Sequence, residues 1–94
     1  MANRIRWSSR AISDLESIAA YIEADSPAYA RSVVKKIISA TRQLSRFPRS
    51  GREVPEFENP SIRELIIYSY RIIYKFDDNV INILSVIHGK QKLH

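Results

Sequence analysis

The chain has 94 residues, of which 45% are hydrophobic and 27% are charged, and its formal net charge is +5. This length fits one domain over residues 1–94, and the composition excludes a disordered chain. No apolar run approaches the ~20 residues of a membrane span, so we expect a cytosolic protein that does not associate with membranes. With no cysteine and two histidines, the sequence offers neither disulfides nor an ordinary zinc site, and we expect no cofactor.

The first part of the chain predicts a short strand followed by a helix. Residues 3–7 (NRIRW) alternate as a strand does, and a serine at position 8 or 9 can cap the helix that follows. Apolar residues then recur every three or four positions and predict one buried helix face. The members of this stripe are Ala11, Ile12, Leu15, Ile18, Ala19 and Ile22.

A second helix is predicted directly after the first. Pro27 cannot continue the first helix but suits the first turn of the next, with Ser26 as its cap. We expect this helix to end by Phe47, because the residue before a proline disfavours helical geometry. The predicted result is a helical hairpin.

The second half of the chain predicts an irregular loop and three strands. Residues 48–61 contain three of the four prolines, and residues 62–68, 70–76 and 80–88 are rich in Ile, Tyr, Val and Phe. The tight turn at residues 77–79 makes adjacent strands antiparallel. The predicted fold is therefore α+β, in the order β-α-α-β-β-β, with a twisted sheet covered on one face by the helical hairpin.

Positive charge is concentrated in one segment, since residues 26–52 contain seven basic residues and no acidic one. Such a pattern predicts either a surface for an acidic partner such as nucleic acid, or simply solvated helix faces. The seven residues are Arg31, Lys35, Lys36, Arg42, Arg46, Arg49 and Arg52.

Arg71 interrupts an otherwise apolar strand, SYRIIYKF. Because side chains alternate across a strand, we expect Tyr70, Ile72 and Tyr74 to pack on the helices and Arg71 to lie on the opposite, more open face. If Arg71 converges with Arg63 and His88, the guanidinium groups can hold a phosphate and the imidazole can donate a proton, as in a metal-free ribonuclease.

In that arrangement Glu64 is the candidate general base. The alternative is a structural role, in which Arg71 is a surface charge paired with Glu64 and His88 merely ends a strand. The register of the strands, which decides whether these side chains share a face, cannot be read from the sequence.

Five short motifs, in this order and spacing, resemble the RelE/ParE toxins of bacterial toxin–antitoxin modules. They cover nearly the whole chain: A-x-x-D-L-x-x-I-x-x-Y-I at residues 11–22, L-x-x-F-P-x-x-G-R-x-V-P at 44–55, R-E-L at 63–65, Y-R-I-x-Y at 70–74 and V-x-H-G at 86–89. The resemblance implies a small toxin that is held inactive by an acidic antitoxin, the pair repressing its own operon by contacting operator DNA through the antitoxin.

The resemblance implies one of two activities. RelE-like members cut mRNA on the ribosome without a metal, whereas ParE-like members bind DNA gyrase and are not known to cut anything. In the nucleases, the arginine at the Arg71 position contacts the scissile phosphate, lysines lie on the preceding strand, and an Arg, Tyr or His near the C-terminus assists the leaving group. Here no lysine lies at residues 62–64, although Glu64, Arg71 and His88 match a Glu, Arg and His combination used by some nucleases.

We therefore favour the ParE-like gyrase inhibitor, with the nuclease as the alternative and a degenerate toxin that only binds its antitoxin as a third possibility. The catalytic residues under the nuclease alternative are Glu64, Arg71 and His88. The residues expected to bind nucleic acid or the target are Arg49, Arg52, Arg63, Arg71, Lys90 and Lys92.

Overall fold

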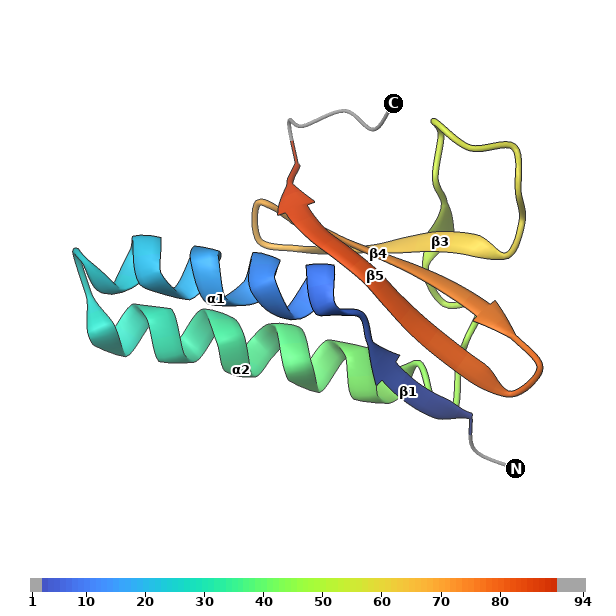
Figure 1. Cartoon of the computed structure of the whole chain (residues 1–94), viewed down its shortest axis with the longest axis horizontal. Helices are drawn as coiled ribbons and strands as arrows, with labels where there is room; N and C mark the ends of the chain where they lie inside the picture. Colours follow the sequence, from blue (N-terminus) through green and yellow to red (C-terminus); the bar gives the residue numbers. More distant parts are fainter. Residues whose placement is uncertain (1–2, 90–94) are drawn as a thin grey trace.

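The computed structural model describes residues 3–89. Two helices and a sheet form a two-layer α+β fold, as the sequence predicts (Figure 1). Within the described range, no helix is long and apolar enough to cross a membrane. In chain order the elements are β1 (Arg4–Trp7), α1 (Ser9–Glu23), α2 (Pro27–Gln43), β2 (Arg52–Glu53), β3 (Ile62–Ile67), β4 (Tyr70–Asp77) and β5 (Val80–His88).

The five strands form one sheet in the order β1-β5-β4-β3-β2. The predicted antiparallel pairing of the last three strands is confirmed, and β1 adds to the outer edge of β5 in parallel. The first and last described strands therefore lie side by side, with β5 between β1 and β4. The strand with which β1 pairs was not predictable, because a strand of four residues carries no register information.

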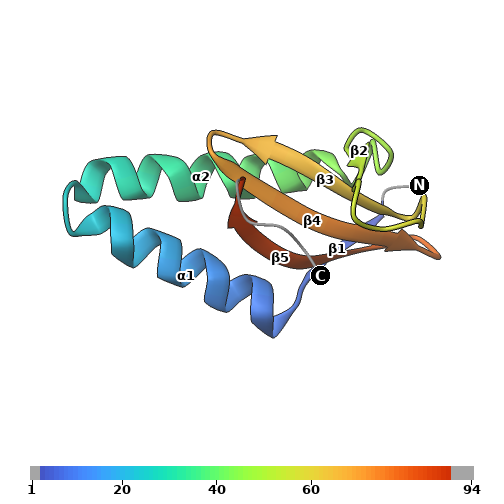
Figure 2. The same ribbon diagram turned by 90° about the horizontal axis from the view of Figure 1, so that it is seen from above.

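The two helices form the predicted hairpin and cover one face of the sheet (Figure 2). Ser8 caps α1 by accepting from the Ala11 amide, and Ser26 caps α2 by accepting from the Tyr29 amide, with Pro27 in the first turn. Helix α2 ends at Gln43, four residues before the predicted limit.

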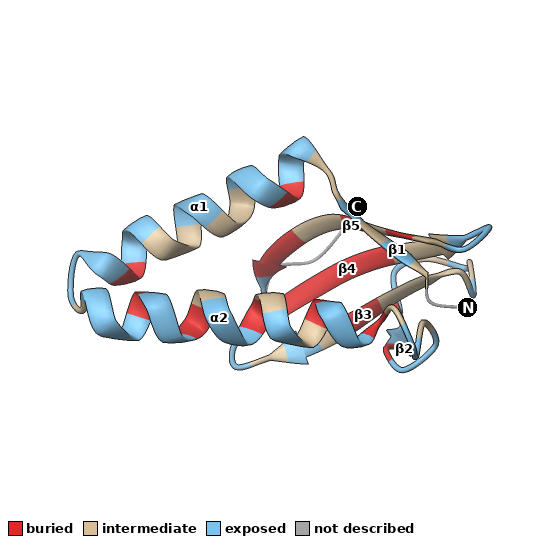
Figure 3. Ribbon diagram, turned by 90° about the horizontal axis from the view of Figure 1, so that it is seen from below, coloured by how far each residue is buried: buried red, intermediate tan, exposed pale blue. Residues whose placement is uncertain are grey.

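The main hydrophobic core lies between this hairpin and the sheet (Figure 3). It joins residues of both helices to β4 and β5, among them Ala11, Val33, Ile37, Ile72 and Tyr74. One residue of the predicted α1 stripe, Ile12, is 47% exposed, because it lies beside the row formed by Ala11, Leu15, Ile18 and Ile22.

Two polar side chains at the start of α1 fasten the helix to β5. The Ser8 hydroxyl donates to the Leu84 carbonyl over 2.9 Å, and the Asp14 carboxylate accepts from the Val86 amide over 2.9 Å. Both contacts lie beside a β-bulge, where the β4–β5 register shifts between Ile73 and Tyr74. The pairing of β1 with β5 ends at Ile83, and beyond it these two side chains supply hydrogen-bond partners for backbone groups of β5.

The tight turn between β4 and β5 has the conformation that the sequence predicts. Asp78 and Asn79 both have positive φ angles, of 45° and 66°, as a two-residue hairpin of the favoured type requires. The long connection at residues 48–61 is less irregular than predicted, because it contains the two-residue strand β2. Strand β2 pairs with β3, placing Arg52 opposite Glu64.

Candidate functional site

Arg71 and Glu64 meet on the sheet face that points away from the helices. The register places Glu64 opposite Ile73, and Ile73 shares a face with Arg71, so the two charged residues are diagonal neighbours. Arg71 Nε donates to Glu64 Oε1 over 2.6 Å. Arg71 is thus paired with Glu64, as in the structural alternative, but neither side chain is a surface charge.

Glu64 binds a second arginine through its other oxygen. Arg52 Nε donates to Glu64 Oε2 over 2.6 Å, which follows from the β2–β3 register. The Glu64 side chain is fully buried, whereas that of Arg52 is 62% exposed. One buried carboxylate thus joins three strands by bridging guanidinium groups from β2 and β4.

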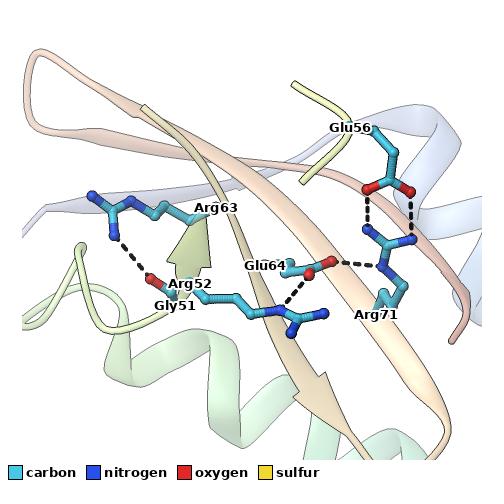
Figure 4. A network of polar contacts seen from close by, with 6 residues as sticks. All are labelled: Gly51, Arg52, Glu56, Arg63, Glu64 and Arg71. Atoms are coloured by element: carbon cyan, nitrogen blue, oxygen red, sulfur yellow. Dashed lines mark hydrogen bonds and ion pairs between the residues drawn. The ribbon is translucent and has the colours of Figure 1, made fainter. Parts of the chain in front are cut away.

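A third carboxylate contact comes from the loop between β2 and β3 (Figure 4). The two terminal nitrogens of Arg71 donate to the two oxygens of Glu56 over 2.9 and 2.8 Å, a bidentate contact. The Arg71 side chain is only 7% exposed. Both edges of the Arg71 guanidinium are therefore engaged by carboxylates of the same chain.

The ion pairs link two arginines with two glutamates. Opposite charges, and hydrogen bonds to the charged form, both favour ionisation. The pKa of Arg71 is therefore raised above its ordinary value, chiefly by the hydrogen bonds to Glu56 and also by Glu64, although burial of the guanidinium acts in the opposite direction. Among the described residues, no buried side-chain nitrogen or oxygen lacks a hydrogen-bond partner. The network, Arg52–Glu64–Arg71–Glu56, therefore satisfies the condition under which charges are tolerated in an interior.

The prediction that Arg71 lies on an open face is wrong in one respect. The face is the one opposite the helices, as expected, but the residues there are covered: Val54, Ile73 and Ile87 are 1%, 2% and 4% exposed. The segment between β2 and β3 carries Val54 and Glu56 on this side of the molecule. Proline and glycine content correctly predicted a surface connection, yet could not show that it folds back over the sheet.

The structure does not bring Arg63 and His88 to Arg71. Arg63 lies opposite Tyr74 in the register and donates to the Gly51 and Pro60 carbonyls over 3.2 and 2.9 Å. His88 lies opposite Tyr70, and the two rings meet edge to face with centroids 6.0 Å apart. Because Tyr70 and Arg71 point to opposite faces, His88 and Arg71 do as well.

The remaining predicted surface residues are dispersed. The Arg49 guanidinium lies 4.9 Å from the centroid of the Phe76 ring, away from the ion-pair network. Lys90 and Lys92 lie outside the described residues. Within residues 3–89, no three His, Asp or Glu side chains are grouped so that they could hold a metal ion.

Sequence reasoning missed Glu56 and the roles of Tyr74 and Gly51. The Tyr74 hydroxyl donates to the Pro48 carbonyl over 2.7 Å and accepts from the Gly51 amide over 3.0 Å, which anchors the loop after α2. Burial raises the pKa of this hydroxyl, and the Gly51 amide and Arg63 oppose the shift. A signal for Glu56 was present in V-P-E-F, since proline favours the second position of a turn and thereby presents the following residue at its tip.

Comparison with known proteins agrees with this geometry. Residues 5–93 match the sequence profile of the ParE toxin of the type II toxin–antitoxin system parDE. The chain belongs to this family. The protein Y4kP of Sinorhizobium fredii is 41% identical over 91 residues, covering 95% of this chain and 91% of its own. Toxin RelE2 of Caulobacter vibrioides is 29% identical over 87 residues, covering 92% and 94%.

Solved structures show the same fold. A chain of the chromosomal ParDE system of P. aeruginosa superposes with a TM-score of 0.77 at 22% identity, covering 95% of this chain and 98% of that one. A chain of the RelBE2 toxin–antitoxin complex of Mycobacterium tuberculosis gives 0.64 at 26% identity, covering 94% and 99%. The protein is thus a type II toxin of the ParE/RelE superfamily.

This ParE-family chain also has an apolar groove on the helical hairpin. It is lined by small and aliphatic side chains and by three basic residues of α2. The apolar lining comprises Ala19, Pro27, Ala30, Val34 and Ile38, and the charged lining comprises Arg31, Lys35, Arg42 and the single acidic residue Glu23.

Proposed function

We propose that the protein is a noncatalytic cytoplasmic toxin that arrests growth by inhibiting DNA gyrase. The proposal is supported by the state of Arg71, whose guanidinium is engaged by Glu64 and Glu56. It is also supported by the position of His88 on the other sheet face and by the absence of lysine from β3, IRELII. A phosphodiester at Arg71 would thus meet neither a proton donor from β5 nor an activating lysine from β3.

The partner that neutralises the toxin is an acidic antitoxin, and contact with operator DNA is made through that antitoxin. The antitoxin could dock on the sheet face around Arg71 or on the helical hairpin, and the hairpin is the better supported, because the loop between β2 and β3 covers the Arg71 face. An amphipathic helix with acidic flanks fits the groove, since its apolar side would meet Val34 and Ile38 and its acids would meet Lys35.

A RelE-like, ribosome-dependent mRNA endoribonuclease is the second candidate. The observation that favours it is the direct contact between Glu64 and Arg71, a candidate base beside a candidate phosphate ligand. This activity requires Glu56 to leave Arg71. The third candidate is a degenerate toxin that only binds its antitoxin. Such a protein would neither inhibit DNA gyrase nor cut mRNA.

Growth arrest on expression without an antitoxin is the first test of the toxin activity. If the cells grow normally while they contain abundant, folded protein, the toxin activity is contradicted. The degenerate toxin, which only binds its antitoxin, is then the remaining candidate. A gyrase supercoiling assay with purified protein, beside primer extension on translated transcripts, then separates the mechanisms. We expect blocked supercoiling and no ribosome-dependent cuts.

The variant Arg71→Lys, checked for folding, gives the matched comparison. Under the gyrase proposal, inhibition persists in Arg71→Lys as long as the protein is folded. Under the nuclease alternative, the cleavage rate of Arg71→Lys falls by a factor of about 100 or more. This is the usual effect of losing a hydrogen-bond donor that stabilises the transition state, ~3 kcal/mol. Cuts that vanish in Arg71→Lys would replace the gyrase proposal by the nuclease.

A further inference from the structure

Three hollows follow one another along the exposed side of α2 (Figure 3). Ser39 lines all three, so they form one continuous surface, the α2 track. An aromatic ring lies at each end, Tyr68 of the β3–β4 turn and Phe47 after α2, and these residues are 54% and 59% exposed. Between the rings the track carries the cations Lys35, Lys36, Arg42 and Arg46, with Leu65 and Ile67 of β3 beside them.

The four cations of the α2 track have no carboxylate partner. Within residues 3–89 none of them takes part in a salt bridge, and no acidic side chain lines any of the three hollows. The apolar groove between the helices differs in this respect, since Glu23 lines it. Unpaired surface cations on a chain of net charge +5 favour a negatively charged ligand such as a phosphate backbone.

Tyr68 holds an uncommon backbone conformation at one end of the α2 track. Its φ angle of 54° lies in the left-handed region, which favours glycine and not a bulky side chain. The turn is fixed from the neighbouring strand, because the Gly89 amide donates to the Ser69 carbonyl. The Tyr68 ring lies beside that of Tyr29, with centroids 6.5 Å apart and planes tilted by 56°. Backbone strain of this kind is concentrated at binding sites, and here it presents an exposed ring.

We propose that the α2 track binds a single strand of nucleic acid, with bases stacked on Tyr68 and Phe47 and phosphates beside the four cations. A positively charged surface combined with exposed aromatic rings is the usual means of binding an unpaired strand, because every base has a face that can stack. The track belongs to the helical layer, whereas Arg71 lies on the sheet face away from the helices. The inference therefore goes beyond the proposed function and does not depend on the target of the toxin.

The first test removes the Tyr68 ring from the full chain and measures binding of a short, fluorescent oligonucleotide by anisotropy. Tyr68→Gly should bind about tenfold more weakly than wild type, ~1.4 kcal/mol, which is within the range for one base stacked on an aromatic ring. The control Tyr21→Ala removes a ring that is 79% exposed on α1, outside the track, and should bind as wild type does. The denaturant midpoint of Tyr68→Gly should not fall below that of wild type, because glycine adopts a positive φ angle without strain.

The second test removes one cation, in the variant Lys36→Gln. Lys36 lines the α2 track but not the apolar groove, so the change leaves the proposed antitoxin site intact. The slope of log K against log salt concentration should become smaller by about 0.7, the value for one phosphate contact on a single strand. The control Arg6→Gln removes the same charge from an exposed position on β1 and should leave the slope unchanged.

Oligouridine and oligothymidine are titrated separately, and the tighter binder identifies the kind of strand. A duplex of the same length separates stacking from charge attraction, since its paired bases are not available to the rings; the single strand should bind more tightly. Equal binding by Tyr68→Gly and Tyr21→Ala, or equal salt slopes for Lys36→Gln and Arg6→Gln, would overturn the proposal. A duplex that binds as tightly as the single strand would also overturn it, because positive charge alone would then account for the binding.

Discussion

Arg71 and Glu64 form an ion pair in which the fully buried Glu64 side chain holds an arginine that is 7% exposed, with 2.6 Å between Nε and Oε1. Because Glu64 also binds Arg52, the carboxylate belongs to two ion pairs at once. Removing one partner of a buried ion pair leaves the other charge without compensation. Arg71 is therefore important for stability whether or not it binds a phosphate.

We expect Glu64→Gln to lower the free energy of unfolding by roughly 3–5 kcal/mol, the usual cost of breaking a buried ion pair. The amide keeps the shape of the side chain but leaves Arg71 and Arg52 to share a single neutral oxygen. Urea denaturation at neutral pH measures the loss. The control Glu58→Gln makes the same chemical change on the exposed loop and should stay within ~0.5 kcal/mol of wild type; equal effects of the two variants would contradict a structural role for the network.

The raised pKa of Tyr74 predicts a loss of stability at alkaline pH. Burial raises the folded-state pKa above the ordinary 10.0, so the unfolded chain releases this proton first. The contribution to stability is complete below the unfolded-state pKa, begins to fall once the pH exceeds that value, and is lost as the pH rises through the folded-state pKa. Denaturant midpoints measured from pH 8 to about pH 11 should decline at the top of the range.

The matched variant is Tyr74→Phe, which cannot ionise. It should lose about 1–2 kcal/mol at neutral pH, because the Pro48 carbonyl and the Gly51 amide lose their hydroxyl partner. Above pH 10 its decline should be shallower than that of wild type. An identical alkaline slope in both proteins would assign the decline to other groups.

Gly51 is required by close approach and not by backbone conformation, since no described glycine has a positive φ angle. A Cβ atom at this position would lie 2.6 Å from the Glu64 carbonyl oxygen and 2.7 Å from the Tyr74 hydroxyl. We expect Gly51→Ala to cost about 1–3 kcal/mol, because backbone must shift to admit the methyl group. Thermal unfolding tests this, with Gly89→Ala as the comparison, where the nearest atom is 3.0 Å away.

The proposed antitoxin groove predicts an asymmetry between two adjacent lysines. Only Lys35 of the two lines the groove, whereas Lys36 lines a hollow between α2 and β3, and both lysines line a further hollow beside Tyr68. With the cognate antitoxin, Lys35→Glu should weaken binding by about tenfold or more, since it opposes acidic residues of the partner, and Lys36→Glu should change it little. Calorimetry on the purified pair measures both, and equal losses would remove the groove as the docking site.

The elements of the fold were predictable because their signals are local. Ser8, Ser26 and Pro27 mark helix starts, and Asp78 and Asn79 mark a turn, through chemistry that acts within a few residues. The parallel pairing of β1 with β5 joins residues more than seventy positions apart, as in Arg4 with Val80, and nothing local encodes it.

The candidate site was predictable only in part for the same reason. Strand alternation correctly placed Arg71 on the face opposite the helices. Whether His88 shared that face depended on the β4–β5 register, and the bulge near Tyr74 shifts that register by one residue partway along the pair. The pairing of Arg71 with Glu56 depends on the path of a loop, which sequence periodicity does not describe.

The position of β5 between β1 and β4 has a consequence for how the chain folds. Strand β5 is the last of the described strands in chain order and yet lies in the interior of the sheet, so β1 has no neighbour until residues 80–88 are in place. Folding is consequently completed late, through contacts of large sequence separation, which are slow to form. A chain truncated before Val80 would lack β5, and without it β1 would have no strand to join it to β4 and the rest of the sheet.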